Sequence, residues 1–121
     1  MDCIFCKIAN NEADSFKIYE NDLIKIFLDL NPNSNGHMLV IPKKHITDFT
    51  EMDSETIVAI NDGVKEMQKL IMEKLNPDAI RLVVNYGFLQ AVKHYHVHII
   101  PINKKVEKIK PIEEVYEILT K

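Results

Sequence analysis

Histidines alternate with apolar residues within residues 92–100 of the 121-residue chain. The alternating residues are His94, Tyr95, His96, Val97, His98 and Ile99. Successive side chains of an extended chain point to opposite faces of a sheet, so this pattern predicts a strand with all three imidazoles on one face. Imidazoles act as nucleophiles, proton carriers and metal ligands near neutral pH. We therefore expect this strand to form one wall of an active site, in preference to a half-exposed strand with solvated histidines.

Composition limits the partners that such a site can have. The chain is long enough to bury a core, and we expect residues 1–121 to form one domain. A formal net charge of −3 and the absence of tryptophan argue against nucleic acid as the main partner. No apolar run approaches the roughly 18 residues that a membrane-spanning helix needs, and the N-terminus has no basic region followed by an apolar segment. We therefore expect a cytoplasmic protein with no membrane partner.

Short apolar or alternating runs predict five strands. They lie at residues 16–19, 23–28, 37–42, 81–86 and 92–100. Turn-forming residues fill residues 20–22 and 31–36, where we expect loops. The order of these runs favours hairpin connections and therefore an antiparallel sheet.

One long helix is predicted between an N-cap at Asp53 and the Asn76–Pro77 pair, because apolar residues recur there at intervals of three and four. Its apolar stripe is interpreted as core packing. A short helix at residues 3–8 would bury Ile4, Phe5 and Ile8 together, and a terminal helix at residues 111–121 would begin with a proline at its first position. A sheet with one long helix packed on it is an α+β fold.

The two cysteines, Cys3 and Cys6, are too few and too close together for a secreted disulfide framework. The pair could hold a metal, form a redox couple or be two small buried side chains. A redox Cys-x-x-Cys normally follows a strand and opens a helix, whereas this pair begins the chain. This position argues against a redox couple, and a metal site or two small buried side chains remain.

The residues 94–100, His-Tyr-His-Val-His-Ile-Ile, resemble the His-x-His-x-His-x-x motif of the histidine triad (HIT) family. Further segments fall in the family's order: 3–8 (Cys-Ile-Phe-Cys-Lys-Ile), 27–30 (Phe-Leu-Asp-Leu), 36–45, 85–87 (Asn-Tyr-Gly) and 90–93. The resemblance covers nearly the whole chain. It implies a five-stranded antiparallel sheet with a long helix against it, usually doubled into a homodimer.

The resemblance also implies a reaction, in which a histidine attacks the α-phosphorus of a nucleotide and water hydrolyses the nucleotidyl-histidine intermediate. The motif makes His96 the nucleophile and His98 the partner of the phosphate, while His37 and His94 would support their ring orientation. The implied nucleotide-binding residues are Ile4, Phe5, Ile8, Phe27, Asp29, Leu30, Asn85 and Gln90. The expected ligand is a purine nucleotide or a nucleotide conjugate, either a nucleoside phosphoramidate or a dinucleoside polyphosphate.

Two departures from the family pattern lie just ahead of the triad. Many members carry a hydroxyl residue after Gly-Gln, where this chain has Ala91 after Leu89-Gln90. The connection after Asn85 is also shorter and lacks a second glycine. These changes favour an alternative hypothesis, a nucleotide-binding or partner-binding module with negligible turnover.

A structural zinc ion is implied by the same resemblance. Some bacterial-type HIT proteins with this opening bind zinc through two cysteines and two histidines, which match Cys3, Cys6, His45 and His94 in this chain. Two thiolates and two imidazoles form a closed tetrahedral zinc site. Such a site would fix the N-terminal segment to the base of the histidine strand.

Overall fold

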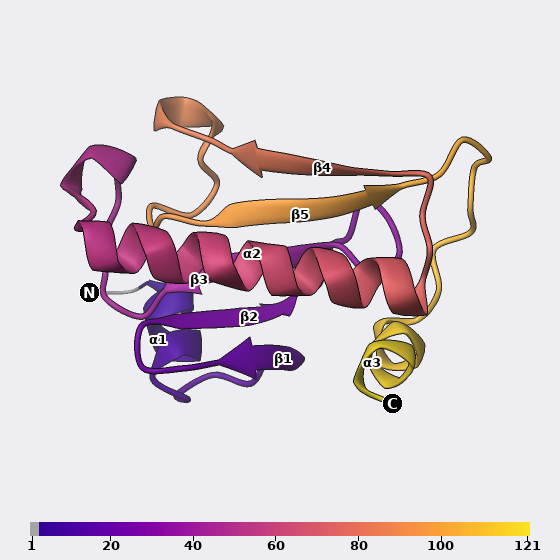
Figure 1. Ribbon diagram of the computed structural model, residues 1–121. Helices are drawn as coiled ribbons and strands as arrows, with labels where there is room; N and C mark the ends of the chain where they lie inside the picture. Colours follow the sequence, from indigo (N-terminus) through magenta and orange to yellow (C-terminus); the bar gives the residue numbers. More distant parts are fainter. Residues whose placement is uncertain (1–2) are drawn as a thin grey trace.

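Five antiparallel strands form one sheet in the computed structural model, which describes residues 3–121 (Figure 1). The strands are β1 (Lys17–Glu20), β2 (Ile24–Leu28), β3 (Met38–Pro42), β4 (Ala79–Val84) and β5 (Val97–Ile102). Their order across the sheet is β1-β2-β3-β5-β4, and each neighbouring pair is antiparallel. The predicted α+β sheet is therefore confirmed, and β1 and β4 are its edges.

The predicted long helix is α2 (Ser54–Lys74), which crosses one face of the sheet (Figure 1). Its N-cap is Asp53, whose Oδ1 accepts a hydrogen bond from the Thr56 N–H at 2.8 Å. The buried residues of its apolar stripe all belong to the main hydrophobic core: Ile60, Val64, Met67 and Ile71. The interpretation of the stripe as core packing is therefore confirmed. Gly63 brings the helix close to the sheet, because a Cβ there would lie 2.7 Å from Cδ1 of Ile24.

The opposite face of the sheet carries α1 (Ile4–Ala9), behind β2 and β3 in Figure 1. Phe5 and Ile8 pack there on Phe27 of β2 and on Leu39 and Ile41 of β3. The prediction that Ile4 is buried with them was wrong, because its side chain points outward from the short helix and is 48% exposed. This outward position matters below, since Ile4 lines a cavity.

A buried lysine ties α1 to the sheet. Lys25 of β2 is 2% exposed, and its ammonium donates to the Ile8 carbonyl oxygen at 2.7 Å and to Oδ1 of Asn11 at 2.9 Å. Burial lowers the pKa of Lys25, because the charged form loses its hydration. Since Asn11 stands at a positive φ of 61° just after the helix, Lys25 both caps α1 and orders the turn that follows.

The histidine strand begins later than predicted. β5 starts at Val97, and residues 91–96 lie outside it, because β4 ends at Val84, opposite Val97, and the ladder with β3 ends at the Val40–Val97 pair. The segment is held instead by a loop, whose Ile46 carbonyl oxygen accepts the Tyr95 N–H at 2.6 Å. The predicted alternation nevertheless persists. The apolar members are buried in the core on the α2 side: Tyr95, Val97 and Ile99.

The C-terminal segment returns across one end of the sheet. The side chain of Asn35 holds it, donating to Oε2 of Glu107 and the Lys108 carbonyl oxygen, both at 3.1 Å, and accepting from the Lys110 N–H at 2.8 Å. The terminal helix α3 (Ile112–Thr120) follows, with Pro111 as its N-cap rather than its first helical residue. None of the helices among residues 3–121 is long and apolar enough to cross a membrane.

Candidate functional site

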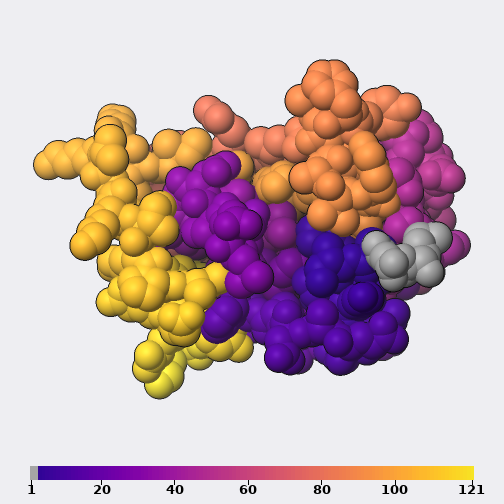
Figure 2. All heavy atoms as spheres, turned by 180° about the vertical axis from the view of Figure 1, so that it is seen from behind, coloured from indigo at the N-terminus to yellow at the C-terminus, as the bar shows by residue number. Residues whose placement is uncertain are grey.

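A cavity of about 400 Å³ opens on the α1 side of the sheet. Figure 2 shows this face, with α1 in indigo between the purple segment around residues 29–37 and the orange segment around residues 85–95. Six of the eight predicted nucleotide-binding residues line the cavity: Ile4, Phe5, Ile8, Phe27, Asp29 and Leu30. His96 and His98 lie at its wall, so the apolar slot, the carboxylate and two triad histidines meet in one place.

The remaining two predicted residues do not line this cavity. Gln90 is 4% exposed, and its amide donates to the Thr47 carbonyl oxygen at 3.0 Å, which fixes the loop ahead of the triad. Asn85 follows β4 and is half-buried. The role of both residues at a phosphate stays a prediction.

Sequence reasoning missed part of the lining. The additional residues are Asp14, Ser15, Leu28, Asn31, Leu39 and Val92, while Ala91, the departure from the family pattern ahead of the triad, also lines the cavity. Leu39 could have been found, because it stands two positions from His37 and shares its face of β3. Asp14 and Ser15 reach the cavity only because the chain turns back after α1, and no local pattern indicates that.

The ring of His96 is fixed by the backbone. Its Nδ1 lies 2.7 Å from the His94 carbonyl oxygen, which can only accept, so Nδ1 carries the proton and Nε2 of the neutral ring has a free lone pair. Phe5 packs edge-to-face on the ring, with centroids 5.0 Å apart. His96 therefore has the tautomer that a nucleophilic Nε2 requires.

A second chain of hydrogen bonds fixes the tautomer of His98. The Asn33 N–H donates to Nδ1 of His37 at 3.0 Å, which leaves the proton of a neutral His37 on Nε2. That Nε2–H donates to Nδ1 of His98 at 2.9 Å, so the proton of His98 is on its own Nε2. His98 thus offers an N–H donor beside the His96 ring, 4.9 Å away between centroids.

Both supporting imidazoles are held neutral. Burial lowers the pKa of His37, although the nearby Asp29 carboxylate opposes the shift. The pKa of His98 is lowered to about 4, chiefly by burial and then by the neighbouring His96 and His37. Near neutral pH, His98 is therefore a neutral donor.

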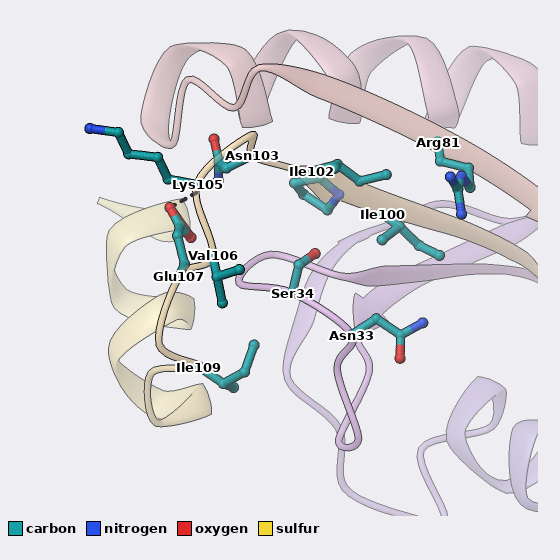
Figure 3. Close-up of a pocket in the computed structure, with 11 residues that line it drawn as sticks. Asn33, Ser34, Arg81, Ile100, Ile102, Asn103, Lys105, Val106, Glu107 and Ile109 are labelled. Atoms are coloured by element: carbon teal, nitrogen blue, oxygen red, sulfur yellow. Dashed lines mark hydrogen bonds between the residues drawn. The ribbon is translucent and has the colours of Figure 1, made fainter.

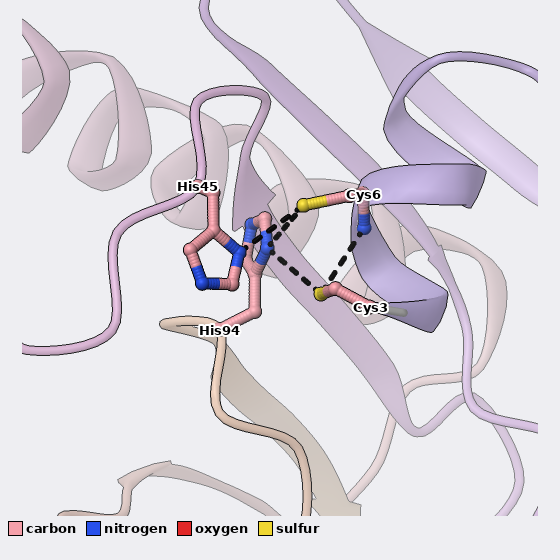
Figure 4. Close-up of side chains that lie close together, drawn as sticks. All are labelled: Cys3, Cys6, His45 and His94. Atoms are coloured by element: carbon pink, nitrogen blue, oxygen red, sulfur yellow. Dashed lines mark hydrogen bonds between the residues drawn. The ribbon is translucent and has the colours of Figure 1, made fainter. Parts of the chain in front are cut away.

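Four side chains predicted to bind metal converge at the N-terminal end of α1 (Figure 4). Their donor atoms, all within 4.8 Å of one another, belong to Cys3, Cys6, His45 and His94. Nδ1 of His94 lies 3.4 Å from Sγ of Cys3 and 3.5 Å from Sγ of Cys6, and Nδ1 of His45 lies 3.1 Å from Sγ of Cys6. Sulfur and nitrogen ligands on one tetrahedral zinc ion are roughly 3.6 Å apart. The geometry and the donor set therefore fit zinc.

The tautomer of His94 also fits a metal ligand. Its Nε2 donates to the Pro42 carbonyl oxygen at 2.8 Å, which leaves the Nδ1 lone pair facing the two sulfurs. The same residue accepts the hydrogen bond of His96 through its carbonyl oxygen. His94 thus joins the cysteine cluster to the candidate nucleophile.

Asp29, His37 and His98 form a second group of metal-binding side chains within 4.8 Å. This group fits a metal poorly. The Asn33 N–H occupies Nδ1 of His37, so the Nε2 that faces the group must carry a proton. We interpret this group as a hydrogen-bonded support for the site.

Comparison with known proteins agrees with this arrangement. The family model described as the HIT domain matches residues 10–105 of the sequence. Adenosine 5'-monophosphoramidase hnt1 of Schizosaccharomyces pombe is 40% identical over 103 residues, which cover 84% of this chain and 74% of that protein. Adenylylsulfatase HINT3 of Arabidopsis thaliana is 38% identical over 102 residues, which cover 83% of this chain and 52% of that protein.

A solved structure is similar over nearly the whole chain. The zinc-bound histidine triad family protein of Mycobacterium smegmatis is 31% identical, covers 99% of this chain and 91% of its own, and superposes with a TM-score of 0.88. The chain belongs to the HIT domain family.

We predict that acid destabilises the native protein through His98. The pKa of a histidine in an unfolded chain is about 6.5, whereas that of native His98 is about 4. The unfolded chain therefore binds more protons between these values, and the free energy of unfolding falls as the pH drops from about 6.5 to about 4. Urea denaturation near neutral pH and at about pH 5 should show a loss on the order of 1 kcal/mol from this residue, allowing for solvent screening.

The control is His98→Gln, which removes the titrating ring and leaves the cysteine and histidine cluster in place. The variant should lose less stability than the wild type over the same pH interval. Equal losses in the two proteins would contradict the prediction.

Proposed function

We propose that the protein is a nucleotide hydrolase that cleaves a bond at an α-phosphate through a nucleotidyl-His96 intermediate. One observation carries the proposal. The His94 carbonyl oxygen holds the proton of His96 on Nδ1, and the ring with its free Nε2 lies at the wall of an apolar cavity. The names of the phosphoramidase and adenylylsulfatase relatives support the same class of reaction.

In the first step Nε2 of His96 attacks the α-phosphorus, and the bond from phosphorus to the leaving group breaks. The leaving group keeps the electron pair and takes up a proton from water. The imidazole becomes positively charged, and the hydrogen bond from its Nδ1–H to the His94 carbonyl oxygen stabilises that charge. Water then attacks phosphorus and releases a proton to solvent, which balances the proton taken up by the leaving group. The bond to Nε2 breaks with its electron pair returning to the ring, and the nucleoside monophosphate leaves with His96 neutral again.

His98 would stabilise the reacting phosphate. Its Nε2–H is a donor fixed by the chain from Asn33 through His37, so no reorientation is needed as negative charge develops on the oxygens. Its low pKa keeps it from taking a proton from solvent near neutral pH. We assign His98 and His37 to transition-state stabilisation and its support.

The nucleoside would lie between α1 and β2. The rings of Phe5 and Phe27, packed edge-to-face at 5.7 Å, border an apolar slot in which a purine can stack. Asp29 stands at the rim, and its Oδ1 already accepts the Asn31 N–H at 2.9 Å. Its carboxylate would accept the ribose hydroxyls, while Gln90 and Asn85 would have to turn toward the phosphates on binding.

A nucleotide-binding module with negligible turnover is the second candidate. Ala91 lines the cavity where many members of the family have a hydroxyl residue, so one donor to the phosphate is missing. The loss of one donor lowers the rate but leaves the nucleophile intact. The hydrolase is therefore the better-supported function.

A zinc ion is proposed at Cys3, Cys6, His45 and His94. The supporting observations are the geometry of the cluster and the zinc-bound relative from Mycobacterium smegmatis. With four protein ligands the ion would be a structural link with no open position for substrate. These ligands would hold α1 against the residue whose carbonyl oxygen orients His96.

A homodimer is proposed through the β4 edge. The edge and the turn after it expose a group of large apolar side chains, namely Leu82, Val84, Tyr86, Phe88 and Leu89, with exposed fractions of 48% to 95%. A long apolar edge strand is a template for pairing with another chain. A second copy that pairs with β4 would cover it and extend the sheet.

We predict that His96→Asn abolishes hydrolysis, because asparagine has no nucleophilic nitrogen. The assay measures mononucleotide released from adenosine 5'-phosphoramidate and from a diadenosine polyphosphate. The surface control is Lys44→Gln, which should retain full activity. A histidine variant such as His45→Gln is unsuitable as a control, because it alters the metal cluster. Substantial activity in folded His96→Asn would refute the nucleophile, and no turnover by the wild type would favour the binding module.

We predict about one zinc ion per chain in protein purified without added metal. Cys6→Ser and His45→Gln should lose most of the metal and unfold at lower temperature, whereas Lys44→Gln should keep both. Elemental analysis and thermal unfolding measure the two effects. Less than roughly a tenth of an equivalent in folded wild type would exclude the site.

We predict that Val84→Asp dissociates the dimer, because a buried carboxylate without a partner is costly at an interface. Val58→Asp, at an exposed position of α2, is the matched control and should leave the assembly unchanged. Sedimentation equilibrium reports the mass. A monomeric wild type, or a dimeric Val84→Asp, would show that β4 is not the interface.

A further inference from the structure

A second hollow, of about 300 Å³, lies between the sheet and the returning C-terminal segment (Figure 3). Ile100, which lines it, shares a face of β5 with His98, so the hollow is on the same side of the sheet as the nucleotide cavity. Arg81 of β4 and Ile100 and Ile102 of β5 line it from the sheet. The returning C-terminal segment closes the opposite side with Lys105 and Val106. Of its lining, only Asn33 takes part in the site described above, through the backbone N–H that holds His37. We call it the Arg81 hollow.

Strand register places the Arg81 hollow directly beyond the catalytic histidines. Val83 pairs with His98, and Arg81 pairs with Ile100 one step further along the same two strands. Side chains two positions apart share a face and are roughly 6.6 Å apart along a strand. A group attached to a phosphate at His98 can therefore extend over Ile100 and reach the Arg81 side chain.

The loop between β2 and β3 separates the two hollows. Asn31 lines the nucleotide cavity, and Asn33 lines the Arg81 hollow. The Asn33 N–H is also the donor that fixes His37, so the wall between the hollows is part of the support of His98. A phosphate at His98 would thus have the nucleoside on one side and the Arg81 hollow on the other.

Among the residues that the structure describes, no acidic side chain neutralises the charge of Arg81. Within residues 3–121 no carboxylate lies within 4.0 Å of its guanidinium, and its side chain makes no hydrogen bond. The acid that lines the hollow is Glu107, whose Oε1 accepts from Asn103 at 2.9 Å and whose Oε2 accepts from Asn35 at 3.1 Å. Both carboxylate oxygens are therefore engaged away from the guanidinium.

The lining also carries a second cation, Lys105, together with apolar side chains and one polar group that lacks a partner. Ile100, Ile102 and Val106 supply apolar contacts, and the buried Oγ of Ser34 has no hydrogen-bond partner among the described residues. A small organic group that ends in an oxyanion matches this combination. Guanidinium groups bind carboxylate and phosphate oxygens with paired N–H donors.

We propose that the Arg81 hollow binds the leaving group of the substrate and that Arg81 selects leaving groups that carry a carboxylate or a phosphate. The proposal rests on the proposed hydrolase function. The reaction is unchanged: the bond from the α-phosphorus to the leaving group breaks, and the leaving group departs with the electron pair and a proton from water. The hollow determines only which leaving group is held in place while His96 attacks.

The experiment compares two substrates that differ in one charge. Adenosine 5'-monophosphate is joined through nitrogen to β-alanine, which ends in a carboxylate, or to β-alanine amide, which is neutral. Arg81→Gln should lower kcat/KM for the carboxylate substrate about fivefold, as expected for one charge-assisted contact of an exposed side chain. For the neutral substrate the change should be less than about twofold. A diadenosine polyphosphate tests the phosphate arm and should follow the carboxylate.

Two further variants test whether the effect of Arg81→Gln comes from recognition of the leaving group and not from misfolding or from the change in net charge. Arg81→Lys keeps the cation and should recover part of the preference, and Lys65→Gln removes an exposed cation of α2 and should change neither substrate. Sedimentation of Arg81→Gln should give the same mass as the wild type. Equal losses on both substrates, or no loss on the carboxylate substrate, would overturn the proposal.

Binding to His96→Asn, measured by calorimetry, tests the hollow without turnover. The carboxylate compound should bind His96→Asn more tightly than the neutral compound does. This difference in affinity should disappear in the double variant that carries both His96→Asn and Arg81→Gln. Equal affinities would overturn the proposal. Failure of the wild type to hydrolyse either compound, with the affinity difference intact, would overturn the hydrolase function and leave the anion site supported.

Discussion

The hydrogen bond from His96 to the His94 carbonyl oxygen is the contact on which the site depends. It decides which nitrogen of His96 is free, and the carbonyl that accepts it belongs to a residue whose own ring faces two cysteine sulfurs. Backbone groups fix the other imidazoles in the same way, through Pro42 for His94 and Asn33 for His37. Each histidine therefore has one defined role, because a backbone carbonyl only accepts and a backbone N–H only donates.

The fold supports these contacts by dividing the sheet into two faces. One face packs on α2, where Gly63 allows close approach, and this face fixes the position of β5. The other face carries α1, the cavity and the histidines. On this second face Lys25 of β2 holds the end of α1 to the sheet, and so fixes the helix that borders both the nucleotide cavity and the cysteine cluster. The nucleotide cavity and the Arg81 hollow then lie on either side of His98, along one surface.

Much of the fold could be predicted because its signals are local. Alternation predicted the two faces of the histidine segment, and the Asp53 cap with its apolar stripe predicted α2. The errors came from contacts between distant segments. β5 begins only at Val97 because its neighbour β4 ends at Val84, opposite Val97, and Ile4 stays exposed because it lies on the outward side of α1. Gln90 is turned to the Thr47 carbonyl oxygen, a partner 43 residues away that no local pattern indicates.

The sequence by itself determined the family, the sheet with its long helix, and the residue types of the site, because these depend on periodicity and on motifs within short segments. Only the tertiary structure decided how those residues act. The pairing of His37 with His98, the convergence of Cys3 and Cys6 with His45 and His94, and the placement of Arg81 beside Ile100 join residues that are distant in the chain. Tautomers, donor geometry and unpaired charge arise from such contacts, and they exist only once the strands have paired in register.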